Sequence, residues 1–329
     1  MNILITSPGV IPVVKYGGTQ RDIWYLGKEL VKMGHKVTYI VDKGSVCPFA
    51  QVIIRNYAVS FSSQIPDDTD IVHFHSLPGE KIAKPYMVSL HGNINDYRQL
   101  DINTVFVSHN HAARFGSDAY VYNGLDWDDY GKPDLKNKRS YYHFLGKAAW
   151  SVKNLKGAIE IIKKTPSEKL MVLGGNRLNI SMGFRFTTSN RVRFKGMVGG
   201  NKKNHLINGS KGLIFPVRWS EPFGLAMPES LYFGCPVFAT PYGSIPELIH
   251  QDVGFLSNKA SELAEAALNA DQYSRKTCHE YARDVFNSKN MADKFLDMYH
   301  TVLNGETLNN TPPRLIQKQE DKFLDFDYS

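Results

Sequence analysis

The chain alternates short apolar runs with longer amphipathic stretches from its first residues. Asn2–Ser7 is predicted to be a strand, and after Gly17-Gly18 apolar residues recur at helical spacing up to about Gly34. Further strands are predicted in this half at Lys36–Val41, Val52–Arg55, Ile71–Phe74, Tyr86–Leu90, Thr104–Ser108 and Ala119–Tyr122. Strands that alternate with helices are typical of parallel α/β domains.

The alternation is interrupted at residues 123–140, which are polar and contain Pro133, and then begins again. Strands are predicted at Tyr141–Leu145, Leu170–Leu173, Val192–Lys195, Gly212–Phe215 and Pro236–Ala239, with helices at 152–163, 224–233, 261–287 and 291–303. We expect an N-terminal domain over 1–135, a second domain over 136–288, and a C-terminal helix and tail over 289–329 that returns to the first domain. Residues 305–329 are polar and are expected to be loosely ordered or wrapped on the surface. The fold class is therefore α/β, with two Rossmann-like parallel-sheet domains facing across a cleft.

Charge is unevenly distributed along the 329 residues. The formal net charge is +7, but residues 132–220 contain nineteen Lys and Arg against three acids, and residues 170–220 contain no acid. Such a segment favours an anionic ligand. A solvated basic face or contact with anionic lipid is an alternative, whereas nucleic acid is disfavoured because no recognition motif accompanies the charge. Three widely separated cysteines and no long apolar run predict a cytoplasmic protein without a structural zinc site.

Two elements are candidates for binding phosphate. Gly17 and Gly18 precede a predicted helix, whose first N–H groups favour anions, although a simple turn explains them equally well. Lys147 follows a strand and Lys153 opens the next helix, so the two cations are candidates to meet at one diphosphate.

The segment 219–230 is the most informative in the chain. It follows an apolar strand, and ligands of open α/β sheets bind at the carboxyl ends of strands. Glu221 and Glu229 flank the amides of Phe223, Gly224 and Leu225. Carboxylates accept hydroxyl donors strongly, so this layout suits a sugar nucleotide, with diols on both sides of a diphosphate.

The E-x7-E element formed by Glu221 and Glu229 resembles that of the retaining family-4 glycosyltransferases, which have the GT-B fold. Further segments resemble that family in the same order along the chain: Tyr16-Gly17-Gly18, residues 34–38, 70–75, Ser89-Leu90-His91-Gly92, Asn123-Gly124-Leu125-Asp126, 146–154 and 243–249. The resemblance implies an EC 2.4 hexosyltransferase that uses a UDP-, GDP- or ADP-sugar with no cofactor and no metal, since two Asp-x-Asp sequences fit turns better. A glycan, a lipid-linked or a small-molecule hydroxyl would be the acceptor, and peripheral membrane contact is a further expectation.

The same resemblance implies roles for individual residues. Glu221 would hold donor-sugar hydroxyls with the amides of 223–225, and Glu229 would hold the ribose. Lys147 and Lys153 would neutralise the diphosphate together with Gly17 and Gly18, and His91 would lie near the anomeric carbon, although a structural role explains His91 as well. The family usually has arginine at the position of Lys147, and the longer spacing to Lys153 leaves Lys156 as a competitor.

Two other functions remain open from the sequence. A sugar-nucleotide epimerase of the same fold would need no acceptor, and a non-catalytic module would only bind anionic ligands. A hydrolase with a carboxylate pair is disfavoured by the surrounding glycines and lysines.

Overall fold

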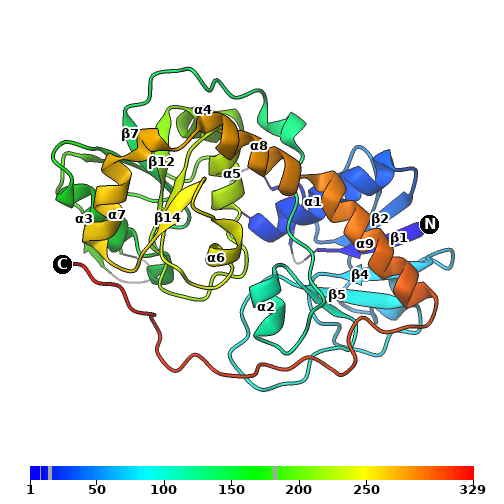
Figure 1. Ribbon diagram of the computed structural model, residues 1–329. Helices are drawn as coiled ribbons and strands as arrows, with labels where there is room; N and C mark the ends of the chain where they lie inside the picture. The colour runs from blue at the N-terminus through cyan, green and yellow to red at the C-terminus, as the bar shows by residue number, and fades with distance from the viewer. Residues whose placement is uncertain (8, 14–16, 181–183) are drawn as a thin grey trace. The chain divides into compact units, whose positions relative to one another are not determined.

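The computed structural model describes residues 1–7, 9–13, 17–180 and 184–329. They form two compact units (Figure 1). Unit 1 contains the described residues up to Asp126 together with Phe286–Gln319, and unit 2 contains Trp127–Val285 and Glu320–Ser329. The chain therefore passes from unit 1 to unit 2 after Asp126, returns to unit 1 at Phe286, and ends in unit 2.

Unit 1 is built on a six-stranded parallel sheet in the order β3-β2-β1-β4-β5-β6. Its strands are β1 (Asn2–Thr6), β2 (Lys36–Val41), β3 (Gln51–Ile54), β4 (Ile71–Phe74), β5 (Tyr86–Leu90) and β6 (Thr104–Phe106). Its helices are α1 (Gly18–Lys32), α2 (His109–Ala113) and α9 (Ser288–Leu303), with a 3-10 turn at Ser62–Gln64. Helix α1 packs against α9 and β2, and α9 also contacts β5. The buried β1 and β4, whose residues are nearly all apolar, form the centre of this sheet.

Unit 2 repeats this architecture with the order β11-β8-β7-β12-β13-β14. Its strands are β7 (Tyr141–Leu145), β8 (Leu170–Leu173), β11 (Val192–Phe194), β12 (Ser210–Phe215), β13 (Val237–Ala239) and β14 (Gly254–Leu256). Its helices are α3 (Leu155–Lys164), α4 (Gly200–Asn208), α5 (Ala226–Tyr232), α6 (Ile245–Leu248), α7 (Ala260–Leu268) and α8 (Arg275–Val285), with 3-10 turns at 127–130, 151–153 and 270–272. A short antiparallel hairpin of β9 (Leu178–Asn179) and β10 (Arg185–Phe186) connects β8 to β11.

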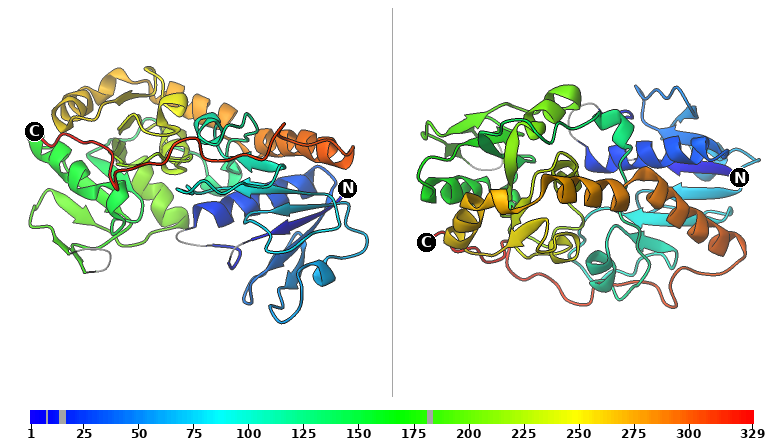
Figure 2. Two further views of the ribbon diagram at one scale, coloured as in Figure 1. Left: turned by 90° about the horizontal axis from the view of Figure 1, so that it is seen from below. Right: turned by 45° about the horizontal axis from the view of Figure 1, so that its top comes forward.

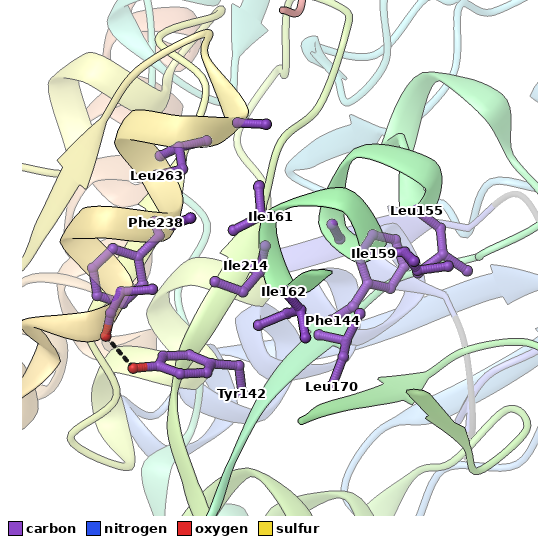
Figure 3. Packing of buried hydrophobic residues seen from close by; sticks show 14 of the residues in the cluster. Tyr142, Phe144, Leu155, Ile159, Ile161, Ile162, Leu170, Ile214, Phe238 and Leu263 are labelled. Atoms are coloured by element: carbon purple, nitrogen blue, oxygen red, sulfur yellow. Dashed lines mark hydrogen bonds between the residues drawn. The ribbon is translucent and has the colours of Figure 1, made fainter. Parts of the chain in front are cut away.

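The core of unit 2 lies between its sheet and helices α3 and α7 (Figure 3). Tyr142, Phe144 and Ile214 from the strands pack with Ile159 from α3 and Leu263 from α7. The Tyr142 hydroxyl donates a hydrogen bond to the Ala267 carbonyl, so this buried polar atom is satisfied. Helix α3 buries Ile159 and Ile162 at the three-residue spacing expected of an amphipathic helix.

When the strands are numbered within each six-stranded sheet, both sheets have the order 3-2-1-4-5-6 of the doubly wound α/β fold. Successive strands are added toward one edge of the sheet up to β3 and β11, and toward the other edge afterwards. The order therefore reverses between β1 and β4 in unit 1 and between β7 and β12 in unit 2. Loops that follow these strands line the crevice where such sheets bind ligands. The predicted α/β class and parallel sheets are confirmed.

Several predicted elements differ from the structure. The expected strand at Ala119–Tyr122 is wrong: it makes one bridge to the sheet, where Phe106 bonds to both Ala119 and Val121, and then leaves it. The helix predicted from Val152 begins only at Leu155, since Asn154 adopts a left-handed conformation with φ 53°. The sequence also gave no indication of α2, α4, α6, β14 or the β9–β10 hairpin. Helix α4 is mostly polar and β14 has three residues, so neither carries a clear periodic pattern.

The polar tail is wrapped on the surface and anchored at separate points. In unit 1, the Leu100 amide donates to the Pro313 carbonyl and Leu315 is buried. In unit 2, the Ala260 amide donates to Asp327, the Asp327 amide donates to Asn258, and Phe326 joins the core. Figure 2 shows the last residues beside α3 and α7. None of the described helices is both long and apolar enough to span a membrane.

Candidate functional site

Glu221 lies in the loop between β12 and α5, after the carboxyl end of the central strand β12. It is 5% exposed, and its backbone pairs with Gly243, where the Ser244 amide donates to the Glu221 carbonyl at 2.9 Å. Gly243 has φ 68°, and a Cβ there would lie 2.3 Å from Glu221 backbone atoms. Only glycine fits this approach without strain, so the turn at 243 fixes the position of Glu221.

The carboxylate of Glu221 is held by a lysine inside an aromatic enclosure. Lys153 Nζ lies 2.5 Å from Glu221 Oε2, and Trp219 Nε1 donates to the same oxygen at 2.8 Å. The ammonium also lies 4.9–5.5 Å from the ring centres of Trp150, Phe215 and Trp219. Both charged side chains are less than a tenth exposed. Burial removes the screening by water, so the attraction between the two charges is strong. Loss of either partner would leave an unpaired buried charge.

The segment that carries the lysines begins at the end of β7, beside the strand that leads to Glu221. Gly146 and Lys147 follow Leu145, and Gly146 approaches Gly174 so closely that a Cβ at 174 would lie 1.8 Å from the Gly146 carbonyl oxygen. Lys147 is exposed. Lys156 is exposed as well, and its Nζ lies 5.0 Å from the ring centre of Tyr328. Lys153 thus contacts Glu221, whereas the exposed Lys147 and Lys156 form no ion pair with Glu221.

The second glutamate of the E-x7-E element is also paired. Glu229 lies in the first turn of α5 and is 1% exposed. Lys203 from α4 forms an ion pair with its Oε1, and the Tyr130 hydroxyl donates to the same oxygen at 2.6 Å. Lys203 Nζ lies 4.9 Å from the Tyr130 ring centre. The sequence analysis missed Lys203 and Tyr130, because nothing in the polar sequence of α4 distinguishes one lysine from its neighbours.

The amides expected between the two glutamates lie at the start of α5. Gly224 has φ 82°, and a Cβ there would be 3.1 Å from Glu221 Cγ, so its backbone packs on that side chain. Leu225 is the N-cap residue of α5, and Phe223 is 2% exposed. Within the described residues, the amides of Gly224 and Leu225 have no hydrogen-bond acceptor. Two donors therefore remain next to the buried carboxylate.

The remaining predicted residues belong to unit 1. Gly17 is the N-cap of α1 with φ 151°, and Gly18 is the first residue of that helix. Tyr16, the first residue of the motif, lies outside the described residues. His91 follows β5 and His75 follows β4, on neighbouring strands. Their Nε2 and Nδ1 atoms are 2.7 Å apart, and the rings are stacked.

Burial keeps these histidines neutral. Desolvation lowers the pKa of His91 to about 4 and that of the neighbouring His73 to about 3, and it holds the pKa of His75 well below its usual value. His73 is fixed in the core, bonded to Tyr299 and Ser89. Two ring nitrogens, Nε2 of His75 and Nδ1 of His91, have no hydrogen-bond partner among the described residues. A neutral imidazole offers one donor and one acceptor, so the pair keeps one donor and one acceptor without a partner among the described residues.

The first aspartate of each Asp-x-Asp sequence, at 126–128 and at 68–70, forms ion pairs with lysines. Asp126 lies 2.9 Å from Lys28 Nζ and 3.0 Å from Lys32 Nζ, and Asp68 lies 2.6 Å from Lys36 Nζ. Over the parts of the chain that the structure describes, no cluster of three or more His, Cys, Asp or Glu side chains has a geometry able to hold a metal ion.

Comparison with known proteins shows what the region around the site is similar to. Residues 140–270 match the model of the glycosyl transferases group 1 family, and this range includes both glutamate–lysine pairs. A curated relative, an uncharacterised 41.2 kDa protein from the cps region of Klebsiella pneumoniae, is 30% identical over 94 residues. That match covers 26% of this chain and 26% of the relative, so the chain aligns with about a quarter of that protein.

Solved structures match nearly the whole chain. AviGT4, a glycosyltransferase of avilamycin A biosynthesis, is 19% identical with a TM-score of 0.74, covering 93% of this chain and 99% of its own. A Rickettsia africae glycosyltransferase is 17% identical with a TM-score of 0.71, covering 93% and 99%. Anabaena HepE in complex with UDP-glucose is 16% identical with a TM-score of 0.66, covering 92% and 100%. At these identities the likeness establishes the fold, which is GT-B. Residues 140–270 are thus similar to the glycosyl transferases group 1 family, within a chain that has a GT-B fold.

Proposed function

We propose that this protein is a retaining glycosyltransferase that transfers a sugar from a nucleoside-diphosphate sugar to a hydroxyl of a glycan, a glycolipid or a small molecule, without a metal ion. The observation that carries this proposal is the buried, lysine-paired Glu221 after the carboxyl end of β12, inside the range that matches the glycosyltransferase family model. HepE, with the same fold, has been crystallised with UDP-glucose, which supports the choice of donor class.

In this proposal Glu221 recognises the donor sugar. Its carboxylate has further lone pairs beyond those taken by Lys153 and Trp219, and carboxylates bind pairs of sugar hydroxyls well. The amides of Gly224 and Leu225, together with that of Phe223, lie at the same loop and would bind oxygens of the donor. Glu229 would accept hydrogen bonds from the ribose hydroxyls.

The cations would stabilise the departing diphosphate. An ammonium has three donors, so Lys153 can bind Glu221 and a phosphate oxygen at the same time, and the exposed Lys147 would bind a second oxygen. Charge that develops on the leaving group is stabilised most when the site is dry and the donors are already in place. The enclosure of Lys153 by three aromatic rings supports this role.

The proposed transfer step needs only the two substrates and groups of this chain. The bond between the anomeric carbon and the phosphate oxygen breaks, and its electron pair leaves with the diphosphate. The acceptor oxygen attacks the same face of the sugar and gives its proton to a phosphate oxygen, so no protein nucleophile is required. In unit 1, His91 would bind a substrate hydroxyl, and Gly17 and Gly18 would bind phosphate at the start of α1.

The proposal is tested by binding and turnover measured with one set of variants. UDP, GDP, ADP and their glucose derivatives are screened by thermal shift, and the best donor is then used in a transfer assay with a lipid-linked or oligosaccharide acceptor. A matching donor well above its Kd should stabilise the protein by a few kcal/mol. Glu221→Gln should lower kcat/KM by roughly tenfold to a hundredfold, since a hydrogen bond to a charged group is lost. Glu265→Gln, on the exposed face of α7, is the matched control.

Three outcomes would count against this function. Full activity of the Glu221→Gln variant would remove Glu221 from the site. No thermal shift with any nucleotide would remove the donor class. Conversion of the sugar when the donor is incubated alone would show an epimerase, which needs no acceptor.

A further inference from the structure

Glu229 is held by two side chains that come from two other elements of unit 2. Lys203 from α4 forms an ion pair with Glu229 Oε1, and the hydroxyl of Tyr130, from the 3-10 turn at 127–130, donates to the same oxygen at 2.6 Å. The carboxylate itself belongs to the first turn of α5, so three elements meet at one oxygen atom. A long, flexible side chain that is fixed in this way has little freedom left to lose when a ligand binds.

The two partners of this carboxylate are fixed in turn. Lys203 is buried, and its Nζ lies 4.9 Å from the ring centre of Tyr130. Asn204, the next residue of α4, donates from Nδ2 to the Tyr130 carbonyl at 3.1 Å, and the hydroxyl of Tyr232 from α5 donates to the Gly131 carbonyl at 2.9 Å. The turn is therefore hydrogen-bonded to both helices that carry the other members of the cluster.

Burial and charge make Glu229 a strong hydrogen-bond acceptor. The side chains of Glu229 and Lys203 are 2% and 8% exposed, so water screens their attraction little. The ammonium favours the ionised carboxylate, which accepts hydrogen bonds and donates none. In addition, Asn204 Oδ1 is buried and has no hydrogen-bond partner among the described residues. Acceptors of this kind are satisfied by a ligand that donates from hydroxyl groups.

We propose that Lys203 and Tyr130 are positioning residues that act through Glu229 to make the site select ribonucleotides over 2′-deoxyribonucleotides. The inference rests on the proposed function, in which Glu229 binds the ribose hydroxyls of the donor. A deoxyribose has a hydrogen atom where the ribose has its 2′-hydroxyl, so it offers the buried carboxylate one donor fewer. Sites built to hydrogen-bond a hydroxyl reject an analogue that lacks it, because a buried polar group is then left unpaired.

Binding of paired nucleotides to the full-length protein tests the proposal. UDP, GDP and ADP are compared with their 2′-deoxy forms by isothermal titration calorimetry. The Kd of the deoxy form divided by that of the ribose form, for the base that binds best, is called the ribose selectivity below. The wild type should have a ribose selectivity of at least about tenfold, since a hydrogen bond to a charged group is lost. The ratio compares two ligands on one protein, so a change in the folded fraction cancels from it.

Variants of the two partners separate positioning from support of the fold. Tyr130→Phe keeps the ring and removes one hydroxyl, and Lys203→Met removes the charge. Each should lower the ribose selectivity by at least about threefold, whereas Lys203→Arg, which keeps the charge, should lower it less than Lys203→Met. Tyr130→Phe should leave the ribose selectivity unchanged in a Glu229→Gln background, because its effect passes through the carboxylate. Tyr130→Phe and Lys203→Arg decide the test where Lys203→Met does not fold.

Two matched controls come from the same region of unit 2. Lys202→Met removes the neighbouring lysine of α4, which is exposed. Tyr141→Phe removes a hydroxyl that donates to the Leu206 carbonyl of α4 at 2.7 Å. Both should keep the wild-type ribose selectivity, since neither residue contacts Glu229.

Three results overturn the proposal. Wild-type protein that binds the ribose and deoxy forms equally has no ribose selectivity, although the donor class then stands. Wild-type selectivity in Tyr130→Phe and Lys203→Arg, and in Lys203→Met where it folds, shows that the partners do not act through Glu229. An equal loss in Lys202→Met or Tyr141→Phe shows a general effect of α4. Wild-type protein that binds none of the nucleotides instead refutes the proposed function itself, on which this inference rests.

Discussion

The candidate site contains two buried carboxylates, and each of them is paired with one lysine. Glu221 is held by Lys153 from the turn before α3, and Glu229 is held by Lys203 from α4. The residue types and the spacing of the glutamates were visible in the sequence, but the identity of each partner was not. The partners are 68 and 26 residues away along the chain, so sheet and helix packing decides them.

Removing one member of the Glu221–Lys153 pair should destabilise unit 2. Lys153→Met leaves a buried carboxylate without its counter-charge, which typically costs about 3–5 kcal/mol. Adding Glu221→Gln to Lys153→Met should restore much of the stability, whereas transfer activity should stay lost in both. Urea denaturation followed by tryptophan fluorescence measures the effect.

Lys156→Met is the control for this cycle, since that side chain is exposed on α3. It should change the free energy of unfolding by less than about 1 kcal/mol. A double variant less stable than Lys153→Met would contradict the charge argument.

At the scale of elements, the last residues of the chain support the loop that carries Lys153. The Tyr328 hydroxyl donates to Asn154 Oδ1 at 3.0 Å, and Asn154 also accepts from the Gly157 amide as the N-cap of α3. Asn154 Nδ2 donates to the Pro216 carbonyl, at the end of β12. The tail is thus hydrogen-bonded to Asn154, which links the turn that carries Lys153 to the end of β12, the strand that leads to Glu221.

Phe326→Ala should destabilise unit 2 and weaken the donor-induced thermal shift. Phe326 is 7% exposed in the core, and a Cβ at Gly157 would lie 2.9 Å from its ring. Loss of a buried phenyl group costs about 3–5 kcal/mol. Thermal unfolding with and without nucleotide measures both effects. Ile316→Ala, which removes a 67% exposed side chain from the same tail, should leave them unchanged. Equal Tm values for the two variants would show that the tail is not part of the fold.

At the scale of the whole molecule, the described residues include four buried histidines and the half-buried His91, distributed over both units. Burial lowers the pKa of His91 to about 4 and that of His73, His111 and His143 to about 3, and also lowers that of His75. Asp22 acts in the opposite direction, because burial raises its pKa to about 8. The histidines outnumber it, so below about pH 6.5 the unfolded chain binds more protons than the folded one.

Stability should therefore fall as the pH drops from about 6.5 toward 4. His143→Gln should reduce this slope by up to about 1.4 kcal/mol per pH unit, since it removes one group that is protonated only when unfolded. Glutamine can keep the hydrogen bonds that His143 makes to Ser210 and Ser230. Urea titrations at several pH values measure the slope, with His205→Gln, exposed on α4, as the control. Stability that is flat over this range would contradict the buried neutral state of the histidines.

The sequence by itself determined the α/β class, most strands of both sheets and the segment that contains Glu221. These features depend on local patterns, because a buried parallel strand such as β8 is apolar throughout and helix α1 repeats its apolar residues. Polar helices such as α4, very short strands such as β14 and the extent of Ala119–Tyr122 carry no such pattern, so sequence reasoning missed or misjudged them.

Only the tertiary structure decided which charges meet, which apolar side chains stay exposed, and where the tail is attached. Lys153 and Lys156 are both lysines near the start of one helix, yet Lys153 is buried among three aromatic rings and Lys156 is exposed beside the Tyr328 ring. Phe184 and Phe326 are both apolar residues in polar surroundings, but the first is exposed and the second is in a core. The burial of a side chain depends on what distant segments bring against it, and a local sequence pattern contains no record of those segments.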